Sequence, residues 1–219
     1  MENKLALIIG VGPGLGLALS KKFFSEGLDV AMVARDKHKL ETFAAKLKNG
    51  FGTVRSYSAD VGDKESLEST IESIVASQGV PEVLIYNVSR LVQSPPLEVV
   101  YDTFIEDFKI NVGGVLVAFQ KIFPMMNEAG KGTILITGGG LSLNPYYEYA
   151  SLGVGKAGLR NLSFSLAQEA SQSDVGVYTV TINGVIAPDT KFDPENIAEK
   201  FYEIFKDGLG PREVEFMFG

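Results

Sequence analysis

Two side chains in the second half of the sequence, Tyr149 and Lys156, have the types and spacing for proton chemistry. A phenol ordinarily titrates near pH 10, and a neighbouring ammonium group lowers its pKa toward neutrality. Such a phenol can hydrogen-bond to a substrate carbonyl and stabilise the charge that forms on its oxygen. Residues seven apart on a helix share a face but lie about 10 Å apart. Tyr149 must therefore lie just before the helix, or act with Lys156 through a bound cofactor and substrate.

The composition leaves few other groups for catalysis. The 219 residues include no cysteine and one histidine, which excludes disulfides, thiol nucleophiles and cysteine-based metal sites. His38 lies in the polar run 35–39 and is interpreted as a solvated surface residue. A multi-histidine metal cluster is therefore excluded, and no metal site is predicted. The net charge of −7 argues against nucleic-acid binding, which needs a basic surface.

A glycine-rich turn joins the first apolar run to the first helical pattern. Glycine permits positive φ and close backbone approach to a phosphate, and a helix N-terminus supplies free N–H groups. The run lacks the Lys-Ser/Thr ending of a nucleoside-triphosphate loop, so a dinucleotide is favoured; a purely structural turn is the alternative. The residues assigned to this site are Gly10, Gly12, Gly14, Leu15 and Gly16.

The end of the second apolar run favours NADP over NAD. NAD sites place a carboxylate there for the ribose hydroxyls, whereas a nearby arginine accommodates a 2′-phosphate. Here the run ends in Arg35, and Asp29 at its start is poorly placed for the ribose. Asp36 follows and can point to solvent. The alternative is that Arg35 is only a solvated loop cation.

Short apolar runs alternate with amphipathic segments along the whole chain. Their continuous apolar character indicates parallel strands that are covered on both faces. We therefore predict one doubly wound Rossmann-type α/β domain over residues 1–219, with a mostly parallel sheet and helices on both faces. The expected strands are Leu5–Ile9, Val30–Val33, Val54–Ser58, Val83–Tyr86, Thr133–Thr137, Tyr178–Ile182 and a last one within 213–218. The expected helices follow Leu15 and lie within 39–48, 66–76, 104–123, 157–170 and 196–205.

Two regional expectations complete this outline. Residues 188–212 begin with a polar, turn-prone segment and are a possible substrate flap near the site. No apolar stretch approaches the roughly 20 residues of a membrane span, so we expect a cytoplasmic protein without membrane partners.

Four further motifs stand near the ends of the expected strands and in one helix. They are Asp60-Val61, Asn87 in 86–89, Asn111 in 109–112, and the stretch 183–188 that contains Ile186. With the glycine spacing and Ala34-Arg35, they resemble the short-chain dehydrogenase/reductase superfamily over nearly the whole chain. The resemblance implies that Asp60 and Val61 contact adenine and that Asn87 and Ile186 belong to the cofactor site. It also implies that Asn111 holds a proton-relay water; stabilisation of a helix bend is the alternative.

The catalytic positions depart from the usual pattern of this superfamily. Lys156 is present, but Leu152 stands where the tyrosine is expected and Gly139 where the serine is expected. The spacing of Tyr149 and Lys156 is instead similar to the Tyr-x6-Lys motif of the enoyl-acyl-carrier-protein reductase branch. Catalysis is thus assigned to Tyr149, Lys156 and Asn111. The alternative is that Tyr149 packs at the rim and Lys156 only binds the ribose.

The resemblance implies an NADP(H)-dependent oxidoreductase that acts on a small molecule by reducing a carbonyl or a carbonyl-conjugated double bond. It also implies a homodimer or homotetramer. Gly153, Gly155 and Gly158 within one helix need a reason close by, either the cofactor face or a helix contact between subunits. The missing acid groups keep open the alternative of a catalytically silent NADP-binding sensor or partner protein.

Overall fold

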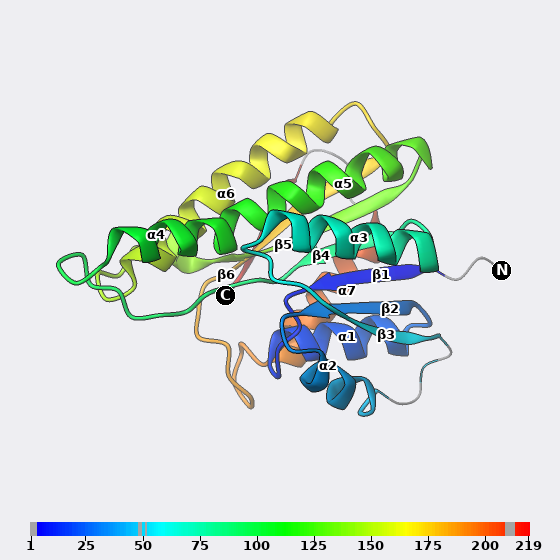
Figure 1. The fold of residues 1–219 in the computed structure, drawn as a ribbon, viewed down its shortest axis with the longest axis horizontal. Coiled ribbons are helices and arrows are strands. Elements are labelled where there is room, and N and C mark those ends of the chain that lie inside the picture. The colour runs from blue at the N-terminus through cyan, green and yellow to red at the C-terminus, as the bar shows by residue number, and fades with distance from the viewer. Residues whose placement is uncertain (1–3, 48–49, 51, 209–212) are drawn as a thin grey trace.

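The computed structural model describes residues 4–47, 50, 52–208 and 213–219, which form one seven-stranded sheet (Figure 1). The strand order is β3-β2-β1-β4-β5-β6-β7, and all six pairings are parallel. The strands are β1 Leu5–Ile9, β2 Asp29–Ala34, β3 Val54–Ser58, β4 Val83–Tyr86, β5 Gly132–Gly139, β6 Val175–Ile182 and β7 Glu215–Phe218. The doubly wound sheet is confirmed, and the order reverses between β1 and β4. Ligands bind at such a reversal, outside the carboxyl ends of the strands.

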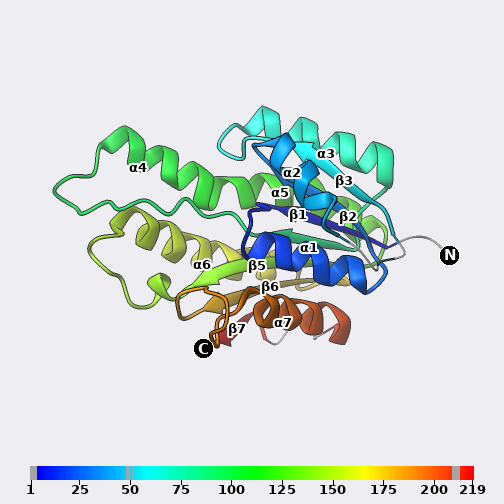
Figure 2. The same ribbon diagram turned by 90° about the horizontal axis from the view of Figure 1, so that it is seen from below.

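Helices cover both faces of the sheet (Figures 1 and 2). They are α1 Leu15–Ser25, α2 Lys37–Ala44, α3 Lys64–Gln78, α4 Tyr101–Phe108, α5 Gly114–Glu128, α6 Ala150–Ala170 and α7 Pro194–Asp207. The apolar side chains of α1, α2 and α7 pack with one face of the sheet, and those of α3, α5 and α6 pack with the other. Two separate cores result, one on each face.

The single helix expected over 104–123 is interrupted by a π-helical turn, Lys109–Gly113, between α4 and α5. The Tyr86 hydroxyl donates to the carbonyl of Ile110 in this turn at 2.7 Å, and burial raises the pKa of that phenol. A Cβ at Gly114 would collide with the same hydroxyl, so glycine is required there. The turn thus fixes the helix against β4 at the level of Asn111.

Most of the segment expected to be a flap is helical. Residues 194–207 form α7, which packs on α1 through buried Ile197 and Phe201, and Asp193 caps the helix by accepting from Glu195 N at 2.8 Å. Residues 209–212 lie outside the described part of the chain. Flap motion stays a prediction, and in the described chain it applies to the loop 188–193. Among the described residues, the structure contains no helix long and apolar enough to cross a membrane.

Candidate active site

The glycines of the first turn have two distinct roles. Gly10 has φ +95°, and a Cβ there would lie 2.5 Å from the carbonyl oxygen of Asn87. A Cβ on Gly16 would lie 2.6 Å from the carbonyl oxygen of Gly10. Both glycines therefore make the tight turn possible. A Cβ on Gly12 or Gly14, in contrast, would meet no atom within 4 Å.

This open space lies at the N-terminus of α1. Gly14 is the residue that precedes the helix, and no side chain caps it. The first N–H groups of a helix have no partner within it, and they lie at the positive end of the helix dipole. Leu15 begins the helix and is buried against the sheet. The turn thus forms an uncapped, uncrowded anion cradle that suits the pyrophosphate of a dinucleotide.

The acidic residues around β2 are committed to structural hydrogen bonds. The Asp29 carboxylate accepts from the hydroxyl of Thr53 at 2.9 Å and also from its N–H. Asp36 caps α2 by accepting from Lys39 N at 3.1 Å, and it forms an ion pair with Lys39 Nζ at 3.4 Å. This backbone hydrogen bond is the main reason that the pKa of Asp36 falls below its ordinary value. Arg35 directly follows β2, and the neighbouring carboxylates of Asp29 and Asp36 are both held by these hydrogen bonds.

The predicted adenine residues follow β3. Asp60 is exposed and forms a local turn in which its Oδ1 accepts from Gly62 N at 2.9 Å, while Val61 is half-buried beside it. Contact with adenine stays a prediction for both residues.

A continuous series of hydrogen bonds joins the glycine turn to Lys156. Asn87 Nδ2 donates to the carbonyl of Gly10 at 3.0 Å, and Thr137 Oγ1 donates to Asn87 Oδ1 at 2.9 Å. Lys156 Nζ then donates to the carbonyl of Thr137 at 2.8 Å. The side chain of Asn87 thus links the end of β1 to β5. Contact of Asn87 with the cofactor stays a prediction.

Lys156 is buried, and burial lowers its pKa to about 8. The aliphatic part of its side chain passes close to Gly139, whose Cβ would lie 3.5 Å from Lys156 Cδ and Cε. That is ordinary van der Waals contact, so the missing serine at this position is not a steric requirement. Ser142, three residues beyond β5, has a buried Oγ with no hydrogen-bond partner among the described residues.

Tyr149 precedes α6 directly and is its N-cap residue, as the seven-residue spacing to Lys156 requires. It is half-buried, and its ring centroid lies 6.3 Å from that of Tyr146. Its backbone pairs with Ser94 in a short parallel bridge. Leu152 lies in the first turn of α6 and is buried. Direct catalysis by Tyr149 stays a prediction.

Asn111 is fully buried in the π-helical turn. Its Oδ1 accepts from the backbone N–H of Arg90 at 2.9 Å, and its Nδ2 has no hydrogen-bond partner among the described residues. A Cβ on Gly155 would lie 2.9 Å from Asn111 Cβ. The structure therefore brings Asn111 against the helix turn that carries Lys156.

Two glycines of α6 allow close packing within the chain, which we did not predict. Gly155 faces Asn111, and a Cβ on Gly158 would lie 3.2 Å from the Phe108 ring. Both allow α6 to approach α4 and the π-helical turn of the same chain. A role of these glycines toward a cofactor or another subunit stays a prediction. At Gly153 a Cβ would meet only the carbonyl of Leu141, at 3.9 Å.

A buried polar network beside the site was not predicted. Asp107 on α4 accepts from Ser151 Oγ at 2.5 Å and pairs with Arg90 Nε at 3.1 Å. The backbone N–H of Ser151 donates to Ser94 Oγ at 3.1 Å. The network fastens the first turn of α6 to α4 and to the loop after β4. The available signal was the acidic side chain of Asp107 on the apolar face of a helix, four residues before Asn111.

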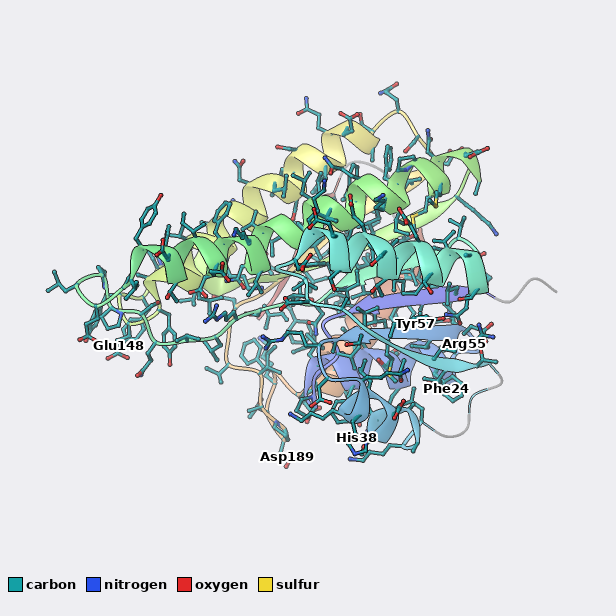
Figure 3. The ribbon with its side chains drawn as sticks, viewed as in Figure 1. Phe24, His38, Arg55, Tyr57, Glu148 and Asp189 are labelled. Atoms are coloured by element: carbon teal, nitrogen blue, oxygen red, sulfur yellow. The ribbon has the colours of Figure 1, made fainter. Side chains whose placement is uncertain are left out.

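The loop after β6 carries the last predicted cofactor residue. Ile186 is exposed there, 39% of its surface being accessible. Asp189 has φ +58°, a left-handed conformation that aspartate tolerates better than most residues, and Figure 3 shows it at the outer tip of this loop. Its backbone N–H donates to Asp193 Oδ2 at 2.9 Å. Contact of Ile186 with the nicotinamide stays a prediction.

Comparisons with known proteins give a consistent result. A family model described as short chain dehydrogenase matches residues 4–196. The chain is 27% identical over 215 residues to oxidoreductase asL5 of Sarocladium schorii, covering 98% of this chain and 79% of that protein. It is 24% identical over 181 residues to D-threitol dehydrogenase of Mycolicibacterium smegmatis, covering 83% and 70% of the two chains.

Two solved structures share the fold over almost their whole length. A metagenomic short-chain oxidoreductase in complex with NADP gives a TM-score of 0.87 at 23% identity, covering 98% of this chain and 96% of that one. A short-chain dehydrogenase from Rhodopseudomonas palustris gives a TM-score of 0.88 at 24% identity, covering 100% and 99%.

Proposed function

Because the chain belongs to the short-chain dehydrogenase family, we propose that it is an NADP(H)-dependent oxidoreductase. It would reduce a carbonyl group or a carbonyl-conjugated double bond of a small molecule. The observation that carries this proposal is the series of hydrogen bonds from Gly10 through Asn87 and Thr137 to Lys156. It holds the anion cradle and the buried lysine in one rigid frame at the carboxyl ends of the strands.

NADP is favoured over NAD by the surroundings of β2. Arg35 would bind the 2′-phosphate, because Asp36 is held as the cap of α2 and Asp29 is held by Thr53. The metagenomic relative of this fold was solved in complex with NADP, which supports the same choice. The cradle at Gly12 and Gly14 would hold the pyrophosphate.

When bound, the cofactor would supply the hydride. The side chains of this chain would donate the proton and stabilise the negative charge that forms on the substrate oxygen. Lys156, held by Thr137, would bind the ribose hydroxyls. Tyr149 would donate to the substrate oxygen as negative charge forms on it. The unpartnered Nδ2 of Asn111 would hold a water that links the buried site to solvent.

The experiment is NADPH oxidation with a panel of ketones, aldehydes and enoyl thioesters, comparing wild type with Tyr149→Phe. Loss of a general acid costs about a hundredfold in rate, so kcat should fall by about that factor while NADPH affinity is retained. Tyr101→Phe, an exposed tyrosine on α4, is the matched control. Equal rates for wild type and Tyr149→Phe would remove the role assigned to Tyr149.

A catalytically silent NADP-binding protein is the second candidate. Leu152 is buried at the position where the family pattern has its tyrosine, and Gly139 offers no hydroxyl. This candidate predicts NADPH binding in a thermal-shift assay without turnover on any substrate of the panel. A measured turnover would eliminate it.

A homodimer or homotetramer remains part of the proposal. Leu116 on α5 and Val154 and Phe164 on α6 are large apolar side chains that are exposed on the outer helices. Analytical ultracentrifugation tests this assembly, and a monomer at micromolar concentration would contradict it.

A further inference from the structure

An open groove of about 640 Å³ lies beside Tyr149, between the loop after β4 and the segment before α6. It is lined by Gln93 and residues 95–98 on one side and by Tyr147 and Glu148 on the other. We call it the outer groove. Figure 3 shows Glu148 at the end of the molecule where α4 and α6 begin.

The outer groove adjoins the segment that carries Tyr149. Ser94 N donates to the carbonyl of Glu148 at 2.7 Å, and Ser94 pairs with Tyr149 in the parallel bridge. Ser94 Oγ accepts from the N–H of Ser151 in the first turn of α6. The same short pairing therefore holds both the groove wall and the proposed proton donor. A substrate whose carbonyl reaches Tyr149 would extend its far end into the groove.

Part of the groove surface is apolar and aromatic. Leu97 is fully exposed, and Tyr147 is 63% exposed. The ring centroids of Tyr146 and Tyr147 lie 5.4 Å apart with an edge-to-face geometry, and Tyr146 also lies next to Tyr149. Clusters of exposed aromatic side chains at a concave surface are typical of binding sites rather than of a plain solvent face.

The charged side chains that line the groove are all acidic. Glu98 and Glu148 are its charged lining residues, and the lining described by the structure contains no cation. Glu148 is the main cause that raises the pKa of Tyr146, so its field reaches the aromatic cluster. Arg90 on the same loop is paired with the buried Asp107, which balances its charge. The whole chain carries a net charge of −7.

We propose that the outer groove binds the far end of the substrate and selects an aromatic carbonyl compound that carries a cationic amine. Tyrosine faces and carboxylates both attract an ammonium group, whereas the two carboxylates repel an anionic end. Thioesters of coenzyme A or of a carrier protein, whose carriers are anionic, are thereby disfavoured. This inference rests on the proposed function, because it assigns the substrate class of the same site.

The test uses three acetophenones that differ only in their para substituent: aminomethyl (cationic), methyl (neutral) and carboxylate (anionic). Their dissociation constants are measured by calorimetry on the full chain with saturating NADP⁺. The expected order of affinity is cation, then neutral compound, then anion. Two carboxylates near the ligand charge in a water-like dielectric should separate the cation from the anion by about tenfold. Raising the NaCl concentration from about 20 mM to about 0.5 M should reduce this affinity ratio to under about threefold.

The decisive variant is Glu98→Gln/Glu148→Gln. It should abolish the spread between the three compounds and leave the affinity for the neutral compound unchanged. Glu128→Gln/Glu203→Gln changes the net charge equally at exposed sites outside the groove and should keep the spread. Equal affinities in the wild type, no binding of any compound, or an unchanged spread in the decisive variant would each overturn the proposal.

The same samples separate this inference from the proposed function. NADPH oxidation with the same ketones tests the oxidoreductase, whereas the order of affinities does not depend on turnover. Ordered binding without turnover would contradict the proposed function and support the groove. Turnover with equal affinities for the three compounds would support the oxidoreductase and overturn the groove.

Discussion

Replacing Lys156 by methionine should stabilise the protein at neutral pH while removing its activity. The ammonium is buried, and burial lowers its pKa from 10.5 to about 8 in the folded state. Below pH 8 the lysine is charged in both states, so the folded state carries the full cost of burying the charge. Between pH 8 and 10.5 the unfolded chain binds more protons than the folded one, so the stability of the wild type rises with pH.

The magnitude follows from this pKa difference. A pKa that falls from 10.5 to about 8 corresponds to about 3 kcal/mol of destabilisation of the charged form. Methionine has a similar shape and no charge, but it leaves the carbonyl of Thr137 without the Lys156 hydrogen bond, which costs about 1 kcal/mol. The net gain at pH 7 is therefore about 2 kcal/mol, or about 4–8 °C in Tm for a domain of this size.

Urea unfolding of the cofactor-free protein at pH 7 and at pH 10.5 measures this effect. The advantage of Lys156→Met over wild type should be present at pH 7 and largely lost at pH 10.5. Lys64→Met is the control, because the side chain of Lys64 is 61% exposed beside Glu68. A Lys156→Met protein that is no more stable than wild type at pH 7, or an advantage that does not change with pH, would refute the reasoning.

Four other substitutions test the packing and the cofactor site. Gly155→Ala should lower the free energy of unfolding by about 1–3 kcal/mol in urea, because the new Cβ would press on Asn111. Gly153→Ala in the same helix should raise it by about 0.5–1 kcal/mol, since that position has room. Arg35→Ala should raise the KM for NADPH about tenfold or more and leave that for NADH unchanged in steady-state assays. Asp107→Ala should cost about 3 kcal/mol in thermal or urea unfolding, because it breaks a buried ion pair.

Each of these expectations has a contrary result. Equal stability of Gly155→Ala and Gly153→Ala would show that α6 does not pack as closely on the π-helical turn as described. A parallel loss of NADPH and NADH affinity in Arg35→Ala would remove its role in selectivity. An unchanged unfolding free energy in Asp107→Ala would mean that the buried polar network around Asp107 contributes no net stability.

The fold was predictable because parallel strands have a strong sequence pattern. Strands that are buried on both faces are continuous apolar runs, and the ends of β1, β3 and β4 were predicted to the residue. The π-helical turn at 109–113 was not predicted, because an insertion of one residue leaves the apolar periodicity of 104–123 nearly intact. The buried hydroxyl of Tyr86, which donates to this turn, lies on a distant strand.

The site was predictable where local motifs determine it and not where distant segments meet. The turn around Gly12 and the position of Tyr149 before α6 follow from adjacent residues. The Asn87 side chain forms hydrogen bonds to both Gly10 and Thr137. Thr137 lies fifty residues away, and no local pattern contains that information. The same holds for Asp107, whose partners Arg90 and Ser151 come from two other segments.

The central claim is that Tyr149 and Lys156 act on a substrate at a bound nicotinamide. A crystal structure with NADP⁺ and a ketone that binds tests it most directly. The account predicts the 2′-phosphate at Arg35, the ribose hydroxyls at Lys156 Nζ, and the Tyr149 hydroxyl hydrogen-bonded to the ketone oxygen beside nicotinamide C4. A Tyr149 hydroxyl that points away from the ketone, with another donor or only water at its oxygen, would contradict it.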